Sequence, residues 1–174
     1  IWLMAEYQRP GYEKNFPNTR IVTLPMCFDP IEAAESKSFT APKLYEAFFM
    51  GSHTSIRSEL LDELKNQVQL YTPKNVPAFM VGSVVKSAQV CLHLHLKIGW
   101  PFTSMMRHHV LLTNGAYIIS EESELPGELD KFVEIVPREN LVDAVKSRVS
   151  DKTIELKAQE RQRQYAANGD IGVE

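Results

Sequence analysis

LYEAFFMGSHTSIRSELLDEL, residues 44–64 of this 174-residue chain, joins an apolar run to an amphipathic helix through a glycine turn. Residues 44–50 are mostly apolar, which predicts a strand buried on both faces. Gly51 breaks the run, and cap-type residues follow it. The helix expected over residues 56–67 carries one apolar face, at Ile56, Leu60, Leu61 and Leu64. A strand that leads through a short turn into such a helix is typical of the α/β class.

The same alternation continues along the chain. Further strands are predicted at residues 68–72, 90–96, 116–120 and 132–136. Further helices are predicted over residues 76–89, 103–114, 137–149 and 151–165. Gly115 stands just after a helix, where a positive φ is tolerated. Short apolar strands that alternate with helices predict a doubly wound parallel sheet with helices on both faces.

The first 42 residues lack this alternation. Residues 1–5 and 20–24 read as short strands. Residues 7–18, rich in Pro, Gly and Asn, predict a loop between them. Residues 25–42 carry three prolines and no clean period, which predicts an irregular linker.

Composition narrows the class of protein. Apolar residues make up 44% of the chain and charged residues 24%, as in soluble globular domains. A formal net charge of −3 and scattered basic residues give no reason to expect a nucleic-acid partner. There is no apolar run long enough for a membrane span and no signal peptide pattern. Cys27 and Cys91 fit no metal or redox spacing, so we expect two reduced, buried thiols and a cytoplasmic protein.

Candidate binding residues follow the predicted strands, because ligands of doubly wound sheets bind beyond the carboxyl ends of the strands. Gly51 and Ser52 follow the first strand, and Arg57 comes early in the next helix. A glycine turn at a helix N-terminus suits an anion such as a diphosphate. The same residues also fit a capped turn without any ligand.

Two later segments add candidates. Thr103 and Arg107 share a helical face, and Arg107 must find either a surface carboxylate or an anionic ligand. Glu121 and Glu122 follow the strand 116–120, where a carboxylate can accept hydrogen bonds from a ribose diol. His95, near the end of its strand, is the histidine best placed to contact a ligand.

Four histidines raise the question of a metal site. They are His93, His95, His108 and His109. Zinc needs three or four converging ligands, and adjacent histidines on a helix point apart. We therefore expect structural histidines and no metal.

Three segments resemble a known family when they are taken in order. They are YEAFFMGSHTSIRSELLDEL (residues 45–64), SVVKSAQVCLHLHLKIGWPFTSMMRHHVLLTNGAYIISEES (residues 83–123) and FVEIVPRENLVDAVKSRVSD (residues 132–151). Together they resemble the C-terminal, donor-binding domain of GT-B glycosyltransferases, closest to the bacterial spore-maturation-type and family-1-like enzymes. The resemblance covers about residues 42–165.

The resemblance implies a Rossmann-like domain at residues 42–174 that binds a nucleotide-diphosphate sugar without a cofactor or a metal. Residues 1–41 then look like the remnant of a preceding acceptor-type domain and its linker, so we expect a fragment or a truncated enzyme. Gly51 and Ser52 would face the diphosphate, and Arg57 and Arg107 would offset its charge. The other implied donor contacts are His95 and Thr103 along the sugar–phosphate cleft and Glu121 or Glu122 near the nucleoside.

The resemblance leaves the catalytic base unknown, because the preceding domain usually carries it. Many members also have a ribose-binding Glu where this chain has Val110. The predicted function is therefore a glycosyltransferase, or part of one, that transfers a sugar to an unknown acceptor. The alternative is a non-catalytic interaction or dimerisation module that has lost donor binding, with a second domain or another copy as partner. An unrelated flavodoxin-like or metal-binding protein is the third possibility.

Overall fold

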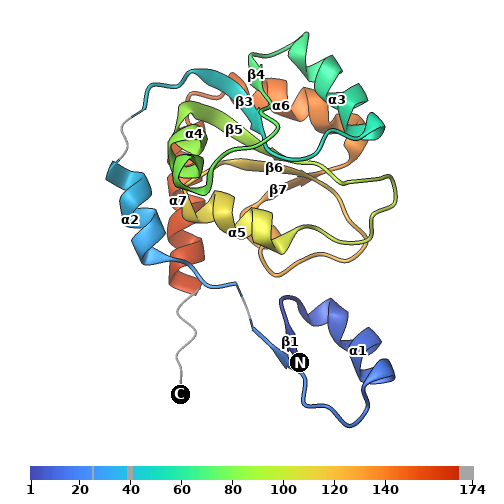
Figure 1. The fold of residues 1–174 in the computed structure, drawn as a ribbon. Coiled ribbons are helices and arrows are strands. Elements are labelled where there is room, and N and C mark those ends of the chain that lie inside the picture. The colour runs from blue at the N-terminus through green and yellow to red at the C-terminus, as the bar shows by residue number, and fades with distance from the viewer. Residues whose placement is uncertain (25, 39–40, 169–174) are drawn as a thin grey trace.

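The computed structural model describes residues 1–24, 26–38 and 41–168. Its centre is a five-stranded, all-parallel sheet in the order β4-β3-β5-β6-β7 (Figure 1). The strands are β3 (Tyr45–Phe49), β4 (Leu70–Tyr71), β5 (Ala88–His93), β6 (Ile118–Glu121) and β7 (Glu134–Val136). The predicted α/β class and parallel sheet are confirmed.

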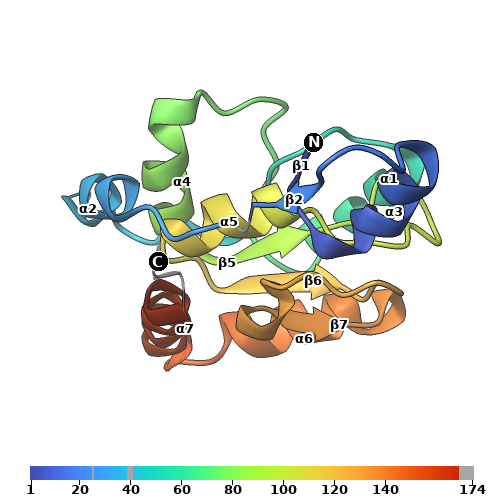
Figure 2. The same ribbon diagram turned by 90° about the horizontal axis from the view of Figure 1, so that it is seen from below.

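Helices cover both faces of the sheet, as Figure 2 shows. One face packs on α4 (Val81–Ser87) and α5 (Met105–Thr113) through a cluster that includes Phe48, Cys91 and Ile118. The other face packs on α3 (Ser55–Lys65) and α6 (Leu141–Val149). The last helix, α7 (Ile154–Asn168), contributes to both clusters. Short 3-10 turns are η2 (Ala78–Met80), η3 (Asp130–Phe132) and η4 (Arg138–Asn140). The sheet is therefore doubly wound, as predicted.

The chain reverses its direction across the sheet between β4 and β5. β3 pairs first with β4 on one side and then with β5 on the other. The loops that leave β3 and β5 therefore diverge to opposite faces, and a crevice opens between them. This switch point is where a doubly wound sheet binds its ligands.

The predicted strand over residues 90–96 ends early, at His93. Arg57 explains the difference, because its guanidinium donates hydrogen bonds to the carbonyl oxygens of Leu94 and His95. These carbonyls are then unavailable to a neighbouring strand. His95 consequently lies beyond the strand, in the loop at the switch point.

The N-terminal unit, residues 1–24, forms a small two-stranded parallel sheet from β1 (Trp2–Leu3) and β2 (Val22–Thr23). The loop predicted over residues 7–18 is wrong, because η1 (Glu6–Gln8) and α1 (Arg9–Asn15) occupy most of it. Pro10 stands in the first turn of α1, where its missing N–H costs nothing. In Figure 1 this unit (blue) lies beside the main body, near the start of α5.

The irregular linker predicted over residues 25–42 is also wrong in its central part, where α2 (Pro30–Ser38) forms. Pro30 begins the helix, and the Asp29 carboxylate accepts hydrogen bonds from the backbone N–H groups of Ile31 and Glu32 at 2.9 and 3.0 Å. Asn114 Nδ2 donates to Glu32 Oε1 at 2.7 Å and ties α2 to the end of α5. The division of the chain at residue 41 stays a prediction. Residues 25, 39 and 40 of the predicted linker lie outside the described residues.

Within the described part of the chain, no helix combines the length and the apolarity that crossing a bilayer requires.

Gly115 has a φ of +75° after the end of α5, as its position predicted. Gly115→Ala is expected to lower the free energy of unfolding by about 1 kcal/mol, because a Cβ is strained at this φ. An added Cβ would also lie 3.4 Å from the Gln162 amide. Urea denaturation measures the effect. Gly11→Ala in α1, where a Cβ meets nothing within 4 Å, is the control and should not destabilise the protein. Equal stability of the two variants would contradict the argument.

Candidate functional site

A cavity of about 350 Å³ opens at the switch point of the sheet. Its walls are the loop after β3 with the start of α3, the end of β5, the loop from Leu94 to Ser104, the first turn of α5 and the N-terminal unit. Its polar lining consists of Ser52, Arg57, His93, His95, Thr103, Ser104 and Arg107, with Tyr7 and Gln8 from the N-terminal unit. No Asp or Glu lines the cavity among the described residues. The cavity is therefore cationic.

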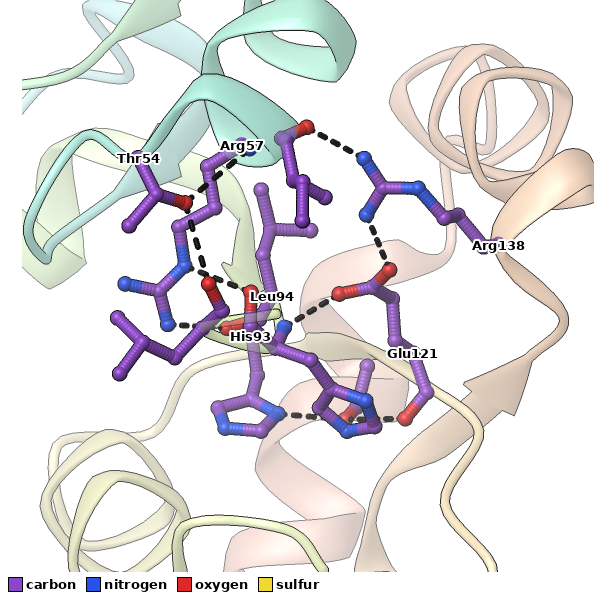
Figure 3. Close-up of polar contacts among 10 residues, drawn as sticks. Thr54, Arg57, His93, Leu94, Glu121 and Arg138 are labelled. Atoms are coloured by element: carbon purple, nitrogen blue, oxygen red, sulfur yellow. Dashed lines mark hydrogen bonds and ion pairs between the residues drawn. The ribbon is translucent and has the colours of Figure 1, made fainter. Parts of the chain in front are cut away.

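Arg57 is buried, with 4% of its surface exposed. Its Nε donates to the His95 carbonyl at 2.9 Å, and a terminal nitrogen donates to the Leu94 carbonyl (Figure 3). Its other terminal nitrogen donates to the Ser52 carbonyl at 3.0 Å. Burial lowers the pKa of Arg57, and Glu121 partly offsets this effect. Arg57 joins the loop after β3 to the loop after β5 and brings a positive charge to the cavity wall.

Arg107 lies in the first turn of α5 and reaches the same cavity. Its Cζ lies 6.0 Å from the centre of the Phe49 ring, while the Cζ of Arg57 lies 5.4 Å from that ring. Burial and the neighbouring Arg57 charge lower the pKa of Arg107 to about 10, so that its side chain is charged at neutral pH. No carboxylate within residues 1–24, 26–38 and 41–168 forms an ion pair with Arg107. Of the two partners predicted for Arg107, the surface carboxylate is thus not found.

Gly51 and Ser52 stand beside these arginines. A Cβ at Gly51 would lie 3.2 Å from a terminal nitrogen of Arg107 and 3.1 Å from the Phe49 ring. The missing side chain therefore leaves room for the Arg107 guanidinium against the end of β3. Ser52 lines the cavity, and its carbonyl accepts a hydrogen bond from Arg57 at 3.0 Å.

His93 is almost wholly buried, and both of its ring nitrogens are engaged. Nε2 accepts a hydrogen bond from the Ser104 N–H at 3.3 Å, so Nδ1 carries the proton and donates to Ser120 Oγ at 2.8 Å. Ser120 in turn donates to the Glu121 carbonyl. Burial, with the nearby His108 and Arg107, lowers the pKa of His93 well below 6.5. His93 is therefore neutral and fixes the start of α5, from which Arg107 projects.

His95 lines the cavity with only 7% of its surface exposed. Its Nε2 is enclosed by protein and has no hydrogen-bond partner among the described residues. Burial lowers the pKa of His95, while the nearby Glu121 carboxylate acts in the opposite direction. The rings of His93 and His95 lie 5.6 Å apart, centre to centre. His95 is thus an unsatisfied polar group at a cationic cavity.

Thr103 closes one side of the cavity and belongs to a buried polar group below it. Its hydroxyl donates to Asp130 at 3.0 Å, and the Gly127 N–H donates to the same carboxylate at 2.8 Å. His108 Nδ1 lies 3.1 Å from Asp130 Oδ1. Burial alone would raise the pKa of Asp130, but these contacts outweigh it and lower the pKa. Asp130 therefore holds a buried negative charge behind Thr103.

Glu121 and Glu122 do not line the cavity. The Glu121 carboxylate is buried, and it accepts hydrogen bonds from the backbone N–H of His95 and from Arg138. Arg138 also donates to the Ile56 carbonyl, so this pair holds the start of α3 against the end of β5 (Figure 3). Glu122 is exposed. The structure thus brings together Gly51, Ser52, Arg57, His95, Thr103 and Arg107 and leaves the two glutamates outside.

No three His, Cys, Asp or Glu side chains of the described residues are placed to hold a metal ion. His93 and His108 are in ring contact at 4.7 Å, but His109 faces away and its Nδ1 lies 2.8 Å from the Tyr165 hydroxyl.

Sequence reasoning missed the apolar part of the cavity wall. Tyr7 and Phe102 stack with ring centres 5.1 Å apart, and Trp100 meets Phe102 edge-on at 5.0 Å. Tyr7 comes from a segment predicted to be a loop far from the sheet, so nothing in its local pattern linked it to this site. Trp100 and Phe102 stand in the turn GWPF, where aromatic residues beyond a strand end could have been noted.

No protein-family model matches this sequence, and a comparison with curated proteins gives no significant match. Solved structures with a similar fold do exist. WaaG, described as a glycosyltransferase involved in lipopolysaccharide biosynthesis, matches with a TM-score of 0.57 at 10% identity, over 99% of this chain and 62% of WaaG. TarM matches with a TM-score of 0.51 at 9% identity, over 100% of this chain and 40% of TarM. A chain of the GtfA/B complex gives a TM-score of 0.49 at 12% identity, over 96% of this chain and 41% of its own length.

The chain spans less than two thirds of the length of each of these structures. At such low identity the likeness concerns the fold. It agrees with the parallel five-stranded sheet and with the family resemblance of the sequence. The chain has the Rossmann-like fold of one half of a GT-B glycosyltransferase.

Proposed function

We propose that this chain is the donor-binding part of a glycosyltransferase and that its cavity receives the diphosphate of a nucleotide sugar. The observation that carries the proposal is Arg107, a partly buried and charged guanidinium at the switch point that forms no ion pair with a carboxylate of the described residues. A buried cation without a partner is costly, and a bound anion would remove that cost.

The surrounding residues suit the same ligand. Arg57 adds a second positive charge, Ser52 and Thr103 offer hydroxyl groups, and Gly51 leaves space beside Arg107. Sugar transfer places negative charge on the departing diphosphate, and fixed cations stabilise that charge without a metal. Glu121 and Glu122 remain predicted nucleoside contacts. In this proposal they would act from outside the cavity wall.

In the proposed whole enzyme, other parts than this chain bind the acceptor and carry the catalytic base. A second domain or a partner copy would supply them, because this chain spans only 62% of WaaG and 40% of TarM. The proposed location is the cytoplasm, in keeping with Cys27 and Cys91, which form no disulfide with one another.

Replacing Arg107 by methionine is expected to weaken diphosphate binding by about 100-fold or more, because a partly buried, charged hydrogen-bond donor is lost. Isothermal titration calorimetry with UDP, GDP and their sugar conjugates, first without metal and then with Mg²⁺, measures this and identifies the base. Arg163→Met is the matched control, since Arg163 is exposed on α7 and pairs with Glu160.

Failure of every nucleotide to bind the folded wild-type protein would overturn the proposal. The alternative is an interaction module, which exposed apolar side chains would favour. Trp2, Phe79 and Ile98 are each at least 75% exposed. Concentration-dependent dimerisation without nucleotide binding, measured by analytical ultracentrifugation, would support that alternative.

A further inference from the structure

We propose that His95 is a ligand-contacting group of the anion site and that it takes up one proton when an anion binds. The inference rests on the proposed anion site and adds a proton to its chemistry. Its basis is the enclosed, unpartnered Nε2 of His95 at a cavity with two arginines and no acid among its described lining residues. A neutral imidazole there has a hydrogen-bonding nitrogen that the protein leaves unsatisfied.

Burial is the main reason that His95 is neutral when the cavity is empty. Arg57 and Arg138 act in the same direction, whereas Glu121 and Asp130 oppose them. The positive groups outnumber the free negative ones, because the Glu121 carboxylate is already paired with Arg138. Asp130 is likewise engaged by Thr103, Gly127 and His108. The charged and titratable neighbours are Arg57 on α3, His93 on β5, Glu121 on β6, Asp130 on η3 and Arg138 on η4, and Arg107 on α5 lines the same cavity.

An anion in the cavity changes this balance. It would stand beside Arg107 and Arg57 and cancel the positive potential that disfavours a proton on His95. A protonated imidazole donates through both nitrogens, so a charged hydrogen bond to the anion becomes available. His93 cannot substitute for His95 in this role, because both of its ring nitrogens already have partners.

Proton uptake on binding makes the affinity for the anion depend on pH, and this dependence can be measured. If one proton enters with the anion, affinity increases by about tenfold for each unit of decrease in pH, between the pKa values of His95 in the free and bound states. Sulfate is the suitable probe, because it remains a dianion across this range and any proton taken up must belong to the protein. Sodium chloride at equal ionic strength controls for screening.

The first measurement is calorimetric titration of sulfate at several pH values between about 5.5 and 8, in buffers of different ionisation enthalpy. We expect an uptake of close to one proton in the wild-type protein. His95→Asn keeps a hydrogen-bond donor but cannot titrate, so its uptake and its pH slope should vanish. His53→Asn is the matched control: His53 is exposed in the neighbouring loop and does not line the cavity, so this variant should keep both.

A second measurement applies to the wild-type protein even if the His95→Asn variant does not fold. The Cε1–H signals of the five histidines are followed by NMR across the same pH range, with and without saturating sulfate. One histidine should show a pKa at least one unit higher with sulfate, and mapping must place it at residue 95. A shift at His53 instead, or at no histidine, would overturn the inference.

The outcomes separate this inference from the proposed function. Sulfate binding with proton uptake but without nucleotide binding would support His95 and count against the donor site. Nucleotide-sugar binding whose affinity is independent of pH, with no shift at His95, would support the donor site and overturn the inference. Failure of sulfate to bind at all would also overturn it.

Discussion

Replacing Arg57 by methionine is expected to lower the free energy of unfolding by about 3–5 kcal/mol, because two buried carbonyl groups and one partly buried carbonyl group lose their donor. These carbonyls belong to Ser52, Leu94 and His95, and the guanidinium contacts all three. Methionine fills a similar volume, so the loss reflects hydrogen bonding more than packing. Urea denaturation followed by circular dichroism measures the change.

Two further variants test this explanation. Arg57→Lys keeps the charge, but one ammonium cannot match the fork of the guanidinium, so an intermediate loss is expected. Arg163→Met removes an exposed arginine and should leave stability nearly unchanged. If Arg57→Met were as stable as Arg163→Met, the three hydrogen bonds would contribute nothing net, and the loop after β5 would need another explanation.

Acidification is expected to destabilise the protein well before its carboxylates titrate. Burial lowers the pKa of His93, His95 and His109 in the folded chain. The unfolded chain protonates its histidines near pH 6.5, so below that pH it binds more protons than the folded chain. Stability is therefore retained above about pH 6.5 and falls as the pH decreases toward the lowered folded pKa values. The slope approaches about 1.4 kcal/mol per pH unit for each such histidine.

Denaturant unfolding at pH values from about 8 to 5 measures this slope. His93→Gln should reduce the slope by about one proton, because His93 has the most strongly lowered pKa of the three. His53→Gln alters an exposed histidine and should leave the slope as it is in the wild type. A stability that does not change between pH 7 and 5 would show that the buried histidines accept protons in the folded protein.

The central fold was predictable from the sequence because its signals are local. Each pattern is contained in a single element: the apolar run before Gly51 forms one strand, and the leucines of α3 form the buried face of one helix. The structure has both elements where they are predicted. The errors in the N-terminal 42 residues have one source. Prolines in both segments favour a loop when the sequence is read alone, but Pro10 and Pro30 each stand in a first helical turn, where proline fits.

The site was predictable only in part. Residues that follow a strand directly, such as Ser52, reach the cavity because the parallel sheet brings the strand ends together. Glu121 also follows a strand directly, yet it pairs with Arg138 away from the cavity. Arg138 follows Pro137 far along the chain, and no local pattern connects it with Glu121. Such tertiary pairings, like the contact of Tyr7 with Phe102, come from the fold as a whole.

The reversal between β4 and β5 also determines the order in which the molecule can assemble. β3 finds β4 soon after both are synthesised, but it becomes a central strand only when β5 follows. Pairing between distant parallel strands is slow, because long loops must close before the contacts form. The cavity further requires α5, so the N-terminal unit, which is synthesised before α5, must wait for that binding surface. The residues of this unit that line the cavity therefore meet their partners in α5 only after about 100 further residues have been synthesised.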